Sequence, residues 1–334
     1  MISSLLIALA AGAASAVMFA SIISGALVSI FLFYLAPLPL MVACLGWGPM
    51  TATIGGIAAA TSLGLMFGMG YLAIFAITIA LPAWWLGHLA LLGRAVEAPA
   101  SVTGPAEPKS EWYPIGRILL WIAVFASITT MAALLTLGTD SETILGTLKR
   151  SFGRIMAGRT EGDSDTIANT IAMIAPSAAS VVAIITLTLN LWLAGRITST
   201  SGRLKRPWPD LHTLALPPMT LVVLCVAIAL IFLGGIVGIF AQIVSATLLM
   251  AYAFTGFATL HALTTGLGSR TIVLSMVYAM TLVLGWPILV AACLGLADAF
   301  FGFRQRLGER RPPHRWRDKA SLQHLTTSNT NKEI

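Results

Sequence analysis

The sequence predicts an all-α fold, a polytopic transmembrane helical bundle of about eight to ten spans with one short interfacial amphipathic helix. Two stretches carry this prediction, because residues 1–93 and 211–269 contain no Asp, Glu, Lys or Arg. The composition agrees, since 57% of the 334 residues are hydrophobic and only 10% are charged, whereas soluble domains carry about 25% charged residues. A span needs about 20 apolar residues. The first stretch alone therefore accommodates about four crossings. The longest polar stretches of the chain are three loops and a tail, which leave no room for a large soluble domain.

Turn-prone residues divide the apolar stretches into expected spans. In chain order these are Ile2–Ala20, Gly25–Leu45, Met50–Gly68, Gly70–Leu92, Ile118–Leu137, Thr166–Gly195, Pro217–Leu233, Ile236–Ala262, Thr271–Leu284 and Ile288–Phe303. The last two are short for a bilayer, so a count of about eight stays open if short segments are re-entrant or fused. We expect residues 1–303 to form one membrane domain and residues 304–334 a basic tail that is partly disordered.

Three polar loops interrupt the apolar sequence, at residues 94–117, 138–165 and 196–212. The first contains three prolines and is predicted to be flexible. In the second, apolar residues recur at helical spacing between Ile144 and Met156, which predicts an amphipathic helix lying in the membrane interface. The acidic run Glu161-Gly-Asp163-Ser-Asp165 that follows could hold a cation, but a turn leading into a helix N-cap is the favoured interpretation.

The distribution of basic residues predicts the topology. The loop at 196–212 and the tail are the most basic segments, so both are expected in the cytoplasm. Counting crossings places the N-terminus and loop 94–117 on the same side and loop 138–165 outside. We therefore expect a multi-pass protein of the bacterial inner membrane with both termini cytoplasmic. The net charge of +7 would suggest nucleic acid in a soluble protein, but here span-flanking residues explain it, and no nucleic-acid partner is predicted.

The signatures of soluble enzymes are missing from the sequence. No GxxxxGK[ST], HExxH or GxSxG motif occurs, which argues against a P-loop ATPase, a zinc hydrolase and a serine esterase. Cys44, Cys225 and Cys293 each lie in an apolar run without a CxxC pair, as expected of small hydrophobic side chains. We therefore predict no catalytic residue, metal or cofactor, and the protein is not expected to be an enzyme.

Small residues recur at every fourth position in two expected spans, which places them on one face of each helix. The two sets are Ala8, Gly12, Ala16 and Ala20, and Gly56, Ala60, Gly64 and Gly68. Such faces let helix backbones approach closely in lipid. Packing within the fold is the first interpretation, and docking of a partner subunit through Ala8–Ala20 is the second.

Polar side chains within the spans are the candidate functional residues, because such groups are costly in hydrocarbon. Asp298 is the one carboxylate in an apolar run, and its expected partners are Arg270 and Arg304, although a place at the headgroup boundary is also possible. Asn190 and Gln242 either form hydrogen bonds between helices or line a solute cavity. A lone histidine such as His261 is more often a packing residue than a ligand-binding one.

Short motifs distributed along the chain resemble the YybS-like family of bacterial membrane proteins. The central ones are Leu189-Asn190 through Gly195-Arg196, Ser201-Gly-Arg203, Arg206-Pro-Trp208-Pro and Leu216-Pro217. Three further stretches fit the family's pattern in the same order: Ala36-Pro-Leu-Pro39, Gly256-Phe-Ala-Thr-Leu-His261-Ala, and Leu294-Gly-Leu-Ala-Asp298 with Phe303-Arg304. The resemblance implies a membrane protein but no defined activity.

That family is distantly similar to the S components of energy-coupling-factor transporters, which bind a micronutrient and dock to a coupling subunit through small-residue faces. The resemblance implies a solute-binding or transport subunit without its own energy source. Asn190, Gln242, His261 and Asp298 would line or support the cavity, and Ala8–Ala20 would dock other membrane subunits. This chain has more spans than a typical S component. The alternative hypothesis is a non-transporting scaffold or envelope assembly factor whose basic loop and tail contact anionic lipid or a cytoplasmic partner. An intramembrane enzyme ranks last.

Overall fold

The computed structural model describes residues 2–96, 109–156, 164–210, 214–265, 267–303 and 306, and in these residues the all-α prediction is confirmed. The α-helices are α1 (Ile2–Ala20), α2 (Leu27–Leu35), α3 (Pro37–Trp47), α4 (Pro49–Phe67), α5 (Met69–Phe75), α6 (Leu81–Leu91), α7 (Ile115–Leu135), α8 (Ser141–Met156), α9 (Ser164–Thr200), α10 (Met219–Ile231), α11 (Gly235–Leu263), α12 (Arg270–Leu284) and α13 (Pro287–Phe301). A 3₁₀ turn at Ser21–Ser24 (η1) follows α1, and a π-helical turn at Ala76–Ala80 (η2) lies between α5 and α6.

Seven helical segments of the described chain are long and apolar enough to cross a membrane, and three shorter apolar helices, α10, α12 and α13, accompany them. Each of the ten expected spans thus has a helical counterpart. Three of the seven segments contain more than one element, since α1 continues into η1, α2 into α3, and α5 through η2 into α6. Helix α9, with 37 residues, is longer than expected and extends about 55 Å, well beyond the roughly 30 Å of a hydrocarbon core.

Prolines explain where several helices begin. Pro37, Pro49 and Pro287 are the first residues of α3, α4 and α13. A proline lacks the backbone N–H that a helix start leaves unbonded in any case, and its fixed φ suits the first turn. The same residues therefore separate the segments along the chain and start the next helix.

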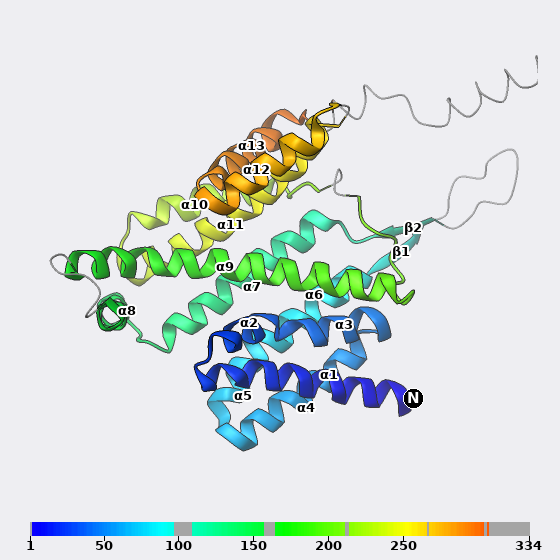
Figure 1. Ribbon diagram of the computed structural model, residues 1–334, viewed down its shortest axis with the longest axis horizontal. Coiled ribbons are helices and arrows are strands. Elements are labelled where there is room, and N and C mark those ends of the chain that lie inside the picture. Colours follow the sequence, from blue (N-terminus) through cyan, green and yellow to red (C-terminus); the bar gives the residue numbers. More distant parts are fainter. Residues whose placement is uncertain are drawn as a thin grey trace, which may run out of the picture.

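The polar loops gather at two opposite ends of the bundle (Figure 1). The N-terminus, the paired strands β1 and β2, and the C-terminal ends of α9 and α13 lie at one end, on the right of the view, whereas α8 lies at the other. Contacts agree with this grouping, because Arg203, in the loop after α9, lies over the ring of Trp47 at the end of α3. The sequence assigns the N-terminus and loops 94–117 and 196–212 to one side, and their described parts lie together; we name this the basic end of the bundle.

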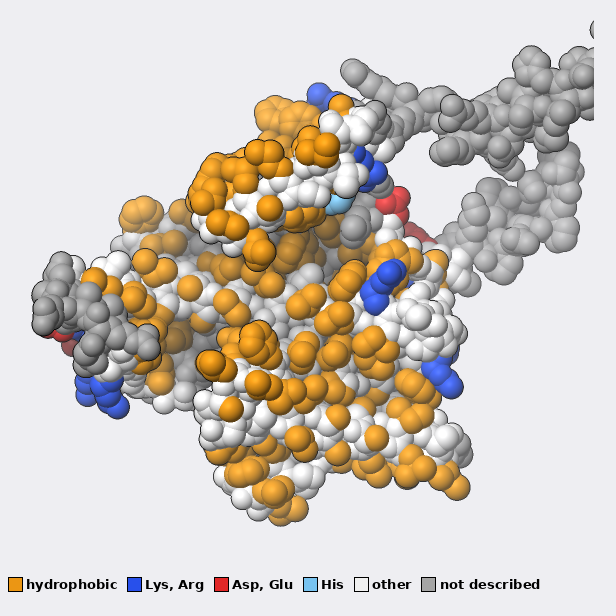
Figure 2. Space-filling model, viewed as in Figure 1, with side chains coloured by type: hydrophobic (Ala, Val, Ile, Leu, Met, Phe, Trp, Pro, Cys, Tyr) orange, Lys and Arg blue, Asp and Glu red, His pale blue; other side chains and the backbone are white. Residues whose placement is uncertain are grey.

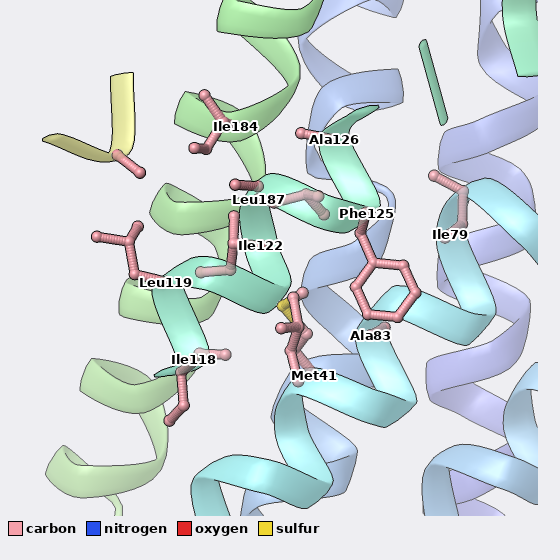
Figure 3. Packing of buried hydrophobic residues seen from close by; sticks show 14 of the residues in the cluster. Met41, Ile79, Ala83, Ile118, Leu119, Ile122, Phe125, Ala126, Ile184 and Leu187 are labelled. Carbon is pink, nitrogen blue, oxygen red and sulfur yellow. The ribbon is translucent and has the colours of Figure 1, made fainter. Parts of the chain in front are cut away.

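Helix α7 lies in the middle of the hydrophobic core (Figure 3). Its residues Ile122 and Leu119 lie on the side of α9, near Leu187, while Phe125 points toward Ala83 of α6. Leu119, Ile122 and Ala83 are at most 4% exposed. The core therefore joins the N-terminal helices to the C-terminal ones.

Helix α8 has the amphipathic pattern expected for loop 138–165. Its apolar face packs against the ends of neighbouring helices: Ile144, fully buried, clusters with Leu134 of α7 and with Ile239 and Ile243 of α11. Asp140 accepts a hydrogen bond from the backbone N–H of Thr143 at 2.9 Å and so caps the first turn. The helix thus covers the end of the bundle opposite the basic end.

The loop at 94–117 is more regular than predicted where the structure describes it. Strand β1 (Gly93–Val96) pairs antiparallel with strand β2 (Lys109–Trp112), and an exposed ion pair joins Arg94 to Glu111 at 3.0 Å. Four-residue strands on polar sequence carry almost no periodic signal. Their pairing follows from the close placement of the ends of α6 and α7, which a sequence pattern does not contain.

Candidate functional site

A half-open groove of about 490 Å³ lies between helices α7, α9, α11 and α12 and the segment that follows α9. Its lining residues are Leu45, Ala90, Ile115, Ile118, Leu119, Ile122, Thr188, Leu191, Trp192, Gly195, Leu204, Arg206, Trp208, Pro209, Leu214, Phe254, Phe257, Ala258, His261, Tyr278 and Thr281. Figure 2 shows the molecule hollowed between α12 and α9, over a floor of hydrophobic side chains. Ligand sites commonly have a volume of about 300–1,000 Å³ and a predominantly apolar lining.

One wall of the groove contains a hydrogen-bonded aromatic pair. The ring nitrogen Nε2 of His261 and the hydroxyl of Tyr278 are 2.8 Å apart, and the Tyr278 ring stacks on Phe257 with centroids 5.4 Å apart. These contacts connect α12 to α11. His261, predicted as a cavity residue, does line the groove, and the sequence analysis did not identify its partner Tyr278.

The segment after α9 closes the groove at the basic end. Arg206 is half-buried there and donates hydrogen bonds to the carbonyl oxygens of Ala90 at 3.3 Å and Tyr113 at 3.0 Å. Burial lowers the pKa of the Arg206 guanidinium, which nevertheless stays protonated because arginine is not deprotonated in proteins. Arg196 lies over the ring of Trp208, 5.1 Å from its centroid, in the range of a cation–π contact.

From the sequence, the arginines of loop 196–212 served as topology markers, as parts of the family motifs and as candidate contacts to anionic lipid or a partner, and no contact within the chain was predicted for them. In the structure three of them make specific contacts within the chain, Arg196 and Arg203 with tryptophan rings and Arg206 with two carbonyls. The available signal was the alternation of arginine and tryptophan in Arg206-Pro-Trp208-Pro. A cation beside an aromatic residue can bind the protein itself as well as a membrane surface.

Asn190 lies outside the groove and joins α2 to α9. It is fully buried, and its Nδ2 donates to the carbonyl oxygens of Tyr34 at 2.8 Å and of Thr186 at 2.9 Å. Tyr34 is in the last turn of α2, where carbonyls have no helical donor. Ser15 of α1 likewise donates to the carbonyl of Ala36 at 2.6 Å. The geometry thus favours the structural interpretation of Asn190.

The other predicted polar residues do not line the groove. Gln242 is half-buried on α11. Asp298 is 6% exposed on the face of α13 that also carries the buried Gly295. Arg270, the first residue of α12, has its Nε buried without a hydrogen-bond partner among the described residues. Arg304 lies outside the described residues, so its pairing with Asp298 stays a prediction.

The small-residue face of α1 is covered by α4. Ala8 and Gly12 are buried, and a Cβ added at Gly12 would overlap the carbonyl oxygen of Gly55, while one at Gly55 would overlap that of Ala8. The second ladder packs inside the chain as well, because Gly64 faces the Leu72 side chain of α5. Ala20 is half-buried, and Ala16 is 9% exposed. Packing within the fold therefore occupies the face that was a candidate for docking a partner.

No protein-family model, curated protein or solved structure matches this chain. The family resemblance therefore stays a prediction, and the argument for function rests on the molecule itself. An apolar bundle of this kind is an integral membrane protein whose helices contact the lipid bilayer.

A second cavity and the acidic run carry less information. The cavity, about 480 Å³, is lined only by apolar residues of α7, α8 and α9, around Pro176 and Phe152. Among the described residues no group of three or more His, Cys, Asp or Glu side chains could hold a metal ion. Glu161 and Asp163 lie outside the described residues, and Asp165 lies in the first turn of α9, as the interpretation of this run as a helix start predicts.

Proposed function

We propose that the protein binds a small, largely apolar molecule in the groove beside α12 and serves as a solute-binding or transport subunit of a bacterial inner membrane. The groove itself is the observation that carries this proposal. It has the volume and the apolar lining of a small-molecule site, with few polar groups in fixed positions. The resemblance to the YybS-like family and, more distantly, to S components agrees with such a role.

The orientation follows from the charges. We place the basic end in the cytoplasm, because Arg196, Arg203 and Arg206 lie there with the loops that flank several helices. The groove then opens near the cytoplasmic surface. Helix α8 lies on the opposite side of the membrane.

The alternative, a scaffold that binds anionic lipid through loop 196–212, is less favoured. Arg196 and Arg203 of that loop lie against tryptophan rings of the same chain, and Arg206 is half-buried against two carbonyls, so these side chains do not extend freely toward a lipid surface. The tail at 304–334 lies outside the described residues and stays a candidate for that role.

A groove-filling variant tests the proposal. Thr188 lines the groove and Leu189, its neighbour on α9, is 47% exposed and does not. We expect protein purified in mild detergent to retain a small molecule that mass spectrometry detects, the Thr188→Trp variant to lose it, and Leu189→Trp to keep it. Equal retention by the two variants, or no retained molecule in the native protein, would contradict the proposal.

A further inference from the structure

We propose that the groove binds an anionic amphiphile, with a carboxylate or phosphate group beside Arg206 and an apolar body between α7, α9 and α11. This inference rests on the proposed function and adds the chemical class of the ligand. The groove combines one cation at its end with a long apolar wall, and that combination matches a molecule with a charged head and a hydrocarbon body.

Arg206 has capacity for an anion. A guanidinium carries five N–H donors, and the two hydrogen bonds of Arg206 go to the neutral carbonyls of Ala90 and Tyr113. About three N–H donors of the Arg206 guanidinium thus remain without a partner among the described residues. This cation is also partly removed from water by burial. A desolvated cation gains most from an anion with suitable geometry, and carboxylates and phosphates both fit the planar fork of arginine.

The wall beyond Arg206 suits an apolar body. On α7 the lining runs from Ile115 to Ile122, and on α9 from Thr188 to Gly195, which corresponds to a depth of about 10 Å along each helix at 1.5 Å per residue. Phe254 and Phe257 of α11 lie across from them in the same lining. An amphiphile with its head at Arg206 and its body along these helices would have the orientation of a lipid in the surrounding leaflet.

The hydroxyl groups of the lining disfavour a highly polar solute. The hydroxyl of Thr188 donates to the carbonyl of Ile184 at 2.7 Å, that of Thr281 to Val277 at 2.7 Å, and Tyr278 contacts His261. These groups already have partners within the protein. A sugar-like molecule would lose its hydration to an apolar wall with few free partners, and unpaired buried polar groups are costly.

A pair of brominated probes tests this ligand class. Dibromostearate and dibromostearyl alcohol have the same chain but differ in charge, and both quench tryptophan fluorescence on contact; Trp192 and Trp208 line the groove. We expect the native protein to bind the acid at least about tenfold more tightly than the alcohol, as one charge-assisted contact provides. Arg206→Gln should remove that preference, so that the acid and the alcohol bind equally.

Matched variants separate the possible failures. Arg203→Gln, which alters the same loop but a residue outside the groove, should keep the preference, and Arg206→Lys should retain most of it if Arg206→Gln does not fold. Equal binding of the acid and the alcohol by the native protein would contradict the proposal that the ligand is anionic, but not the proposal that the groove binds a small molecule. Saturable quenching that Thr188→Trp leaves unchanged, or no saturable quenching at all, would overturn the proposed function itself.

Lysophosphatidate and inorganic phosphate distinguish the sources of the anionic group. Displacement of dibromostearate by lysophosphatidate, with no effect of inorganic phosphate, supports an amphiphile. Displacement of dibromostearate by inorganic phosphate at equal concentration would contradict binding through the apolar wall, because inorganic phosphate can contact Arg206 but has no apolar body.

Discussion

The interface between α1 and α4 and the attachment of α12 are two opposite ways of packing apolar helices. At the first, Gly12 and Gly55 leave no room for even one added carbon atom, so the backbones touch. Helix α12 has no buried residue, and the aromatic side chain of Tyr278 connects it to α11. Small residues remove the space between helices, whereas large ones hold them apart, and the groove lies where the large ones are.

The C-terminal helices contain both kinds of packing. Gly256 of α11 and Gly295 of α13 face each other's helix so closely that a Cβ at either would overlap a carbonyl oxygen, that of Ala291 or of Tyr252. Helix α13 is therefore fixed to α11. Helix α12, next to it in the chain, has no buried residue.

The largest expected effect is at the close interface. Gly12→Leu inserts a side chain where the Gly55 carbonyl lies, and overpacking of this kind costs about 1–3 kcal/mol or more. We expect most of the folded protein to be lost, measured as the monodisperse fraction in detergent by size-exclusion chromatography.

Ala14→Leu is the control, because Ala14 is exposed on the other side of α1 and should tolerate the larger side chain. Equal yields of the two variants would show that α1 and α4 are not packed backbone to backbone.

An intermediate effect is expected at the buried amide. Asn190→Leu removes both hydrogen bonds and leaves the Tyr34 carbonyl without its donor, which in membrane proteins costs about 0.5–2 kcal/mol. Thermal unfolding should shift to lower temperature while retention of the ligand by the folded protein stays unchanged. Thr170→Ala, which removes an exposed hydrogen bond within one helix, should have no comparable effect. If Asn190→Leu lost the ligand but kept the thermal stability of the native protein, Asn190 would be a ligand-binding residue and not a structural one.

Asn190 also illustrates how much of the structure can be predicted from the sequence. The apolar pattern located most of the helices closely, for example Ile2–Ala20, because a hydrocarbon core demands a similar length and composition of each span. Whether an amide in such a span points to a cavity or to another helix depends on the rotation of α9 against α2, and that rotation is set by contacts over 150 residues apart in the chain. The four-residue spacing of small residues likewise showed the small-residue face of α1, but it did not show that this face packs against α4.

A smaller effect is expected where α12 meets α11. Tyr278→Phe removes the hydrogen bond to His261 and keeps the ring that stacks on Phe257, a loss of about 0.5–1.5 kcal/mol. Hydrogen exchange followed by mass spectrometry should then be faster in peptides from 270–284 and unchanged in those from 2–20. Even in the native protein, peptides from α12 should exchange faster than those from α1. Identical protection of α1 and α12 would remove the contrast between the two kinds of packing.

The smallest effect is expected at the exposed cap of α8. The backbone N–H of Thr143 lowers the pKa of Asp140 below its ordinary value of about 3.9. Because the folded pKa is the lower one, the carboxylate stabilises the helix above the unfolded pKa, and this contribution is lost as the pH falls through the folded pKa. Below that pH, α8 should exchange hydrogen faster than in Asp140→Asn, whose amide caps a helix without titrating. No difference between the two proteins in acid would contradict the role of the ionised cap.

Photo-crosslinking tests most directly whether the groove beside α12, where large side chains hold the helices apart, is the binding site. A fatty acid with a diazirine on its chain is bound to the purified protein, irradiated, and its attachment sites are mapped by peptide mass spectrometry. We predict saturable labelling of the groove residues of α7, α9, α11 and α12 that unlabelled fatty acid suppresses. Labelling spread evenly over all lipid-facing helices, or concentrated on α1 and α4, would contradict the proposal that this groove is a binding site.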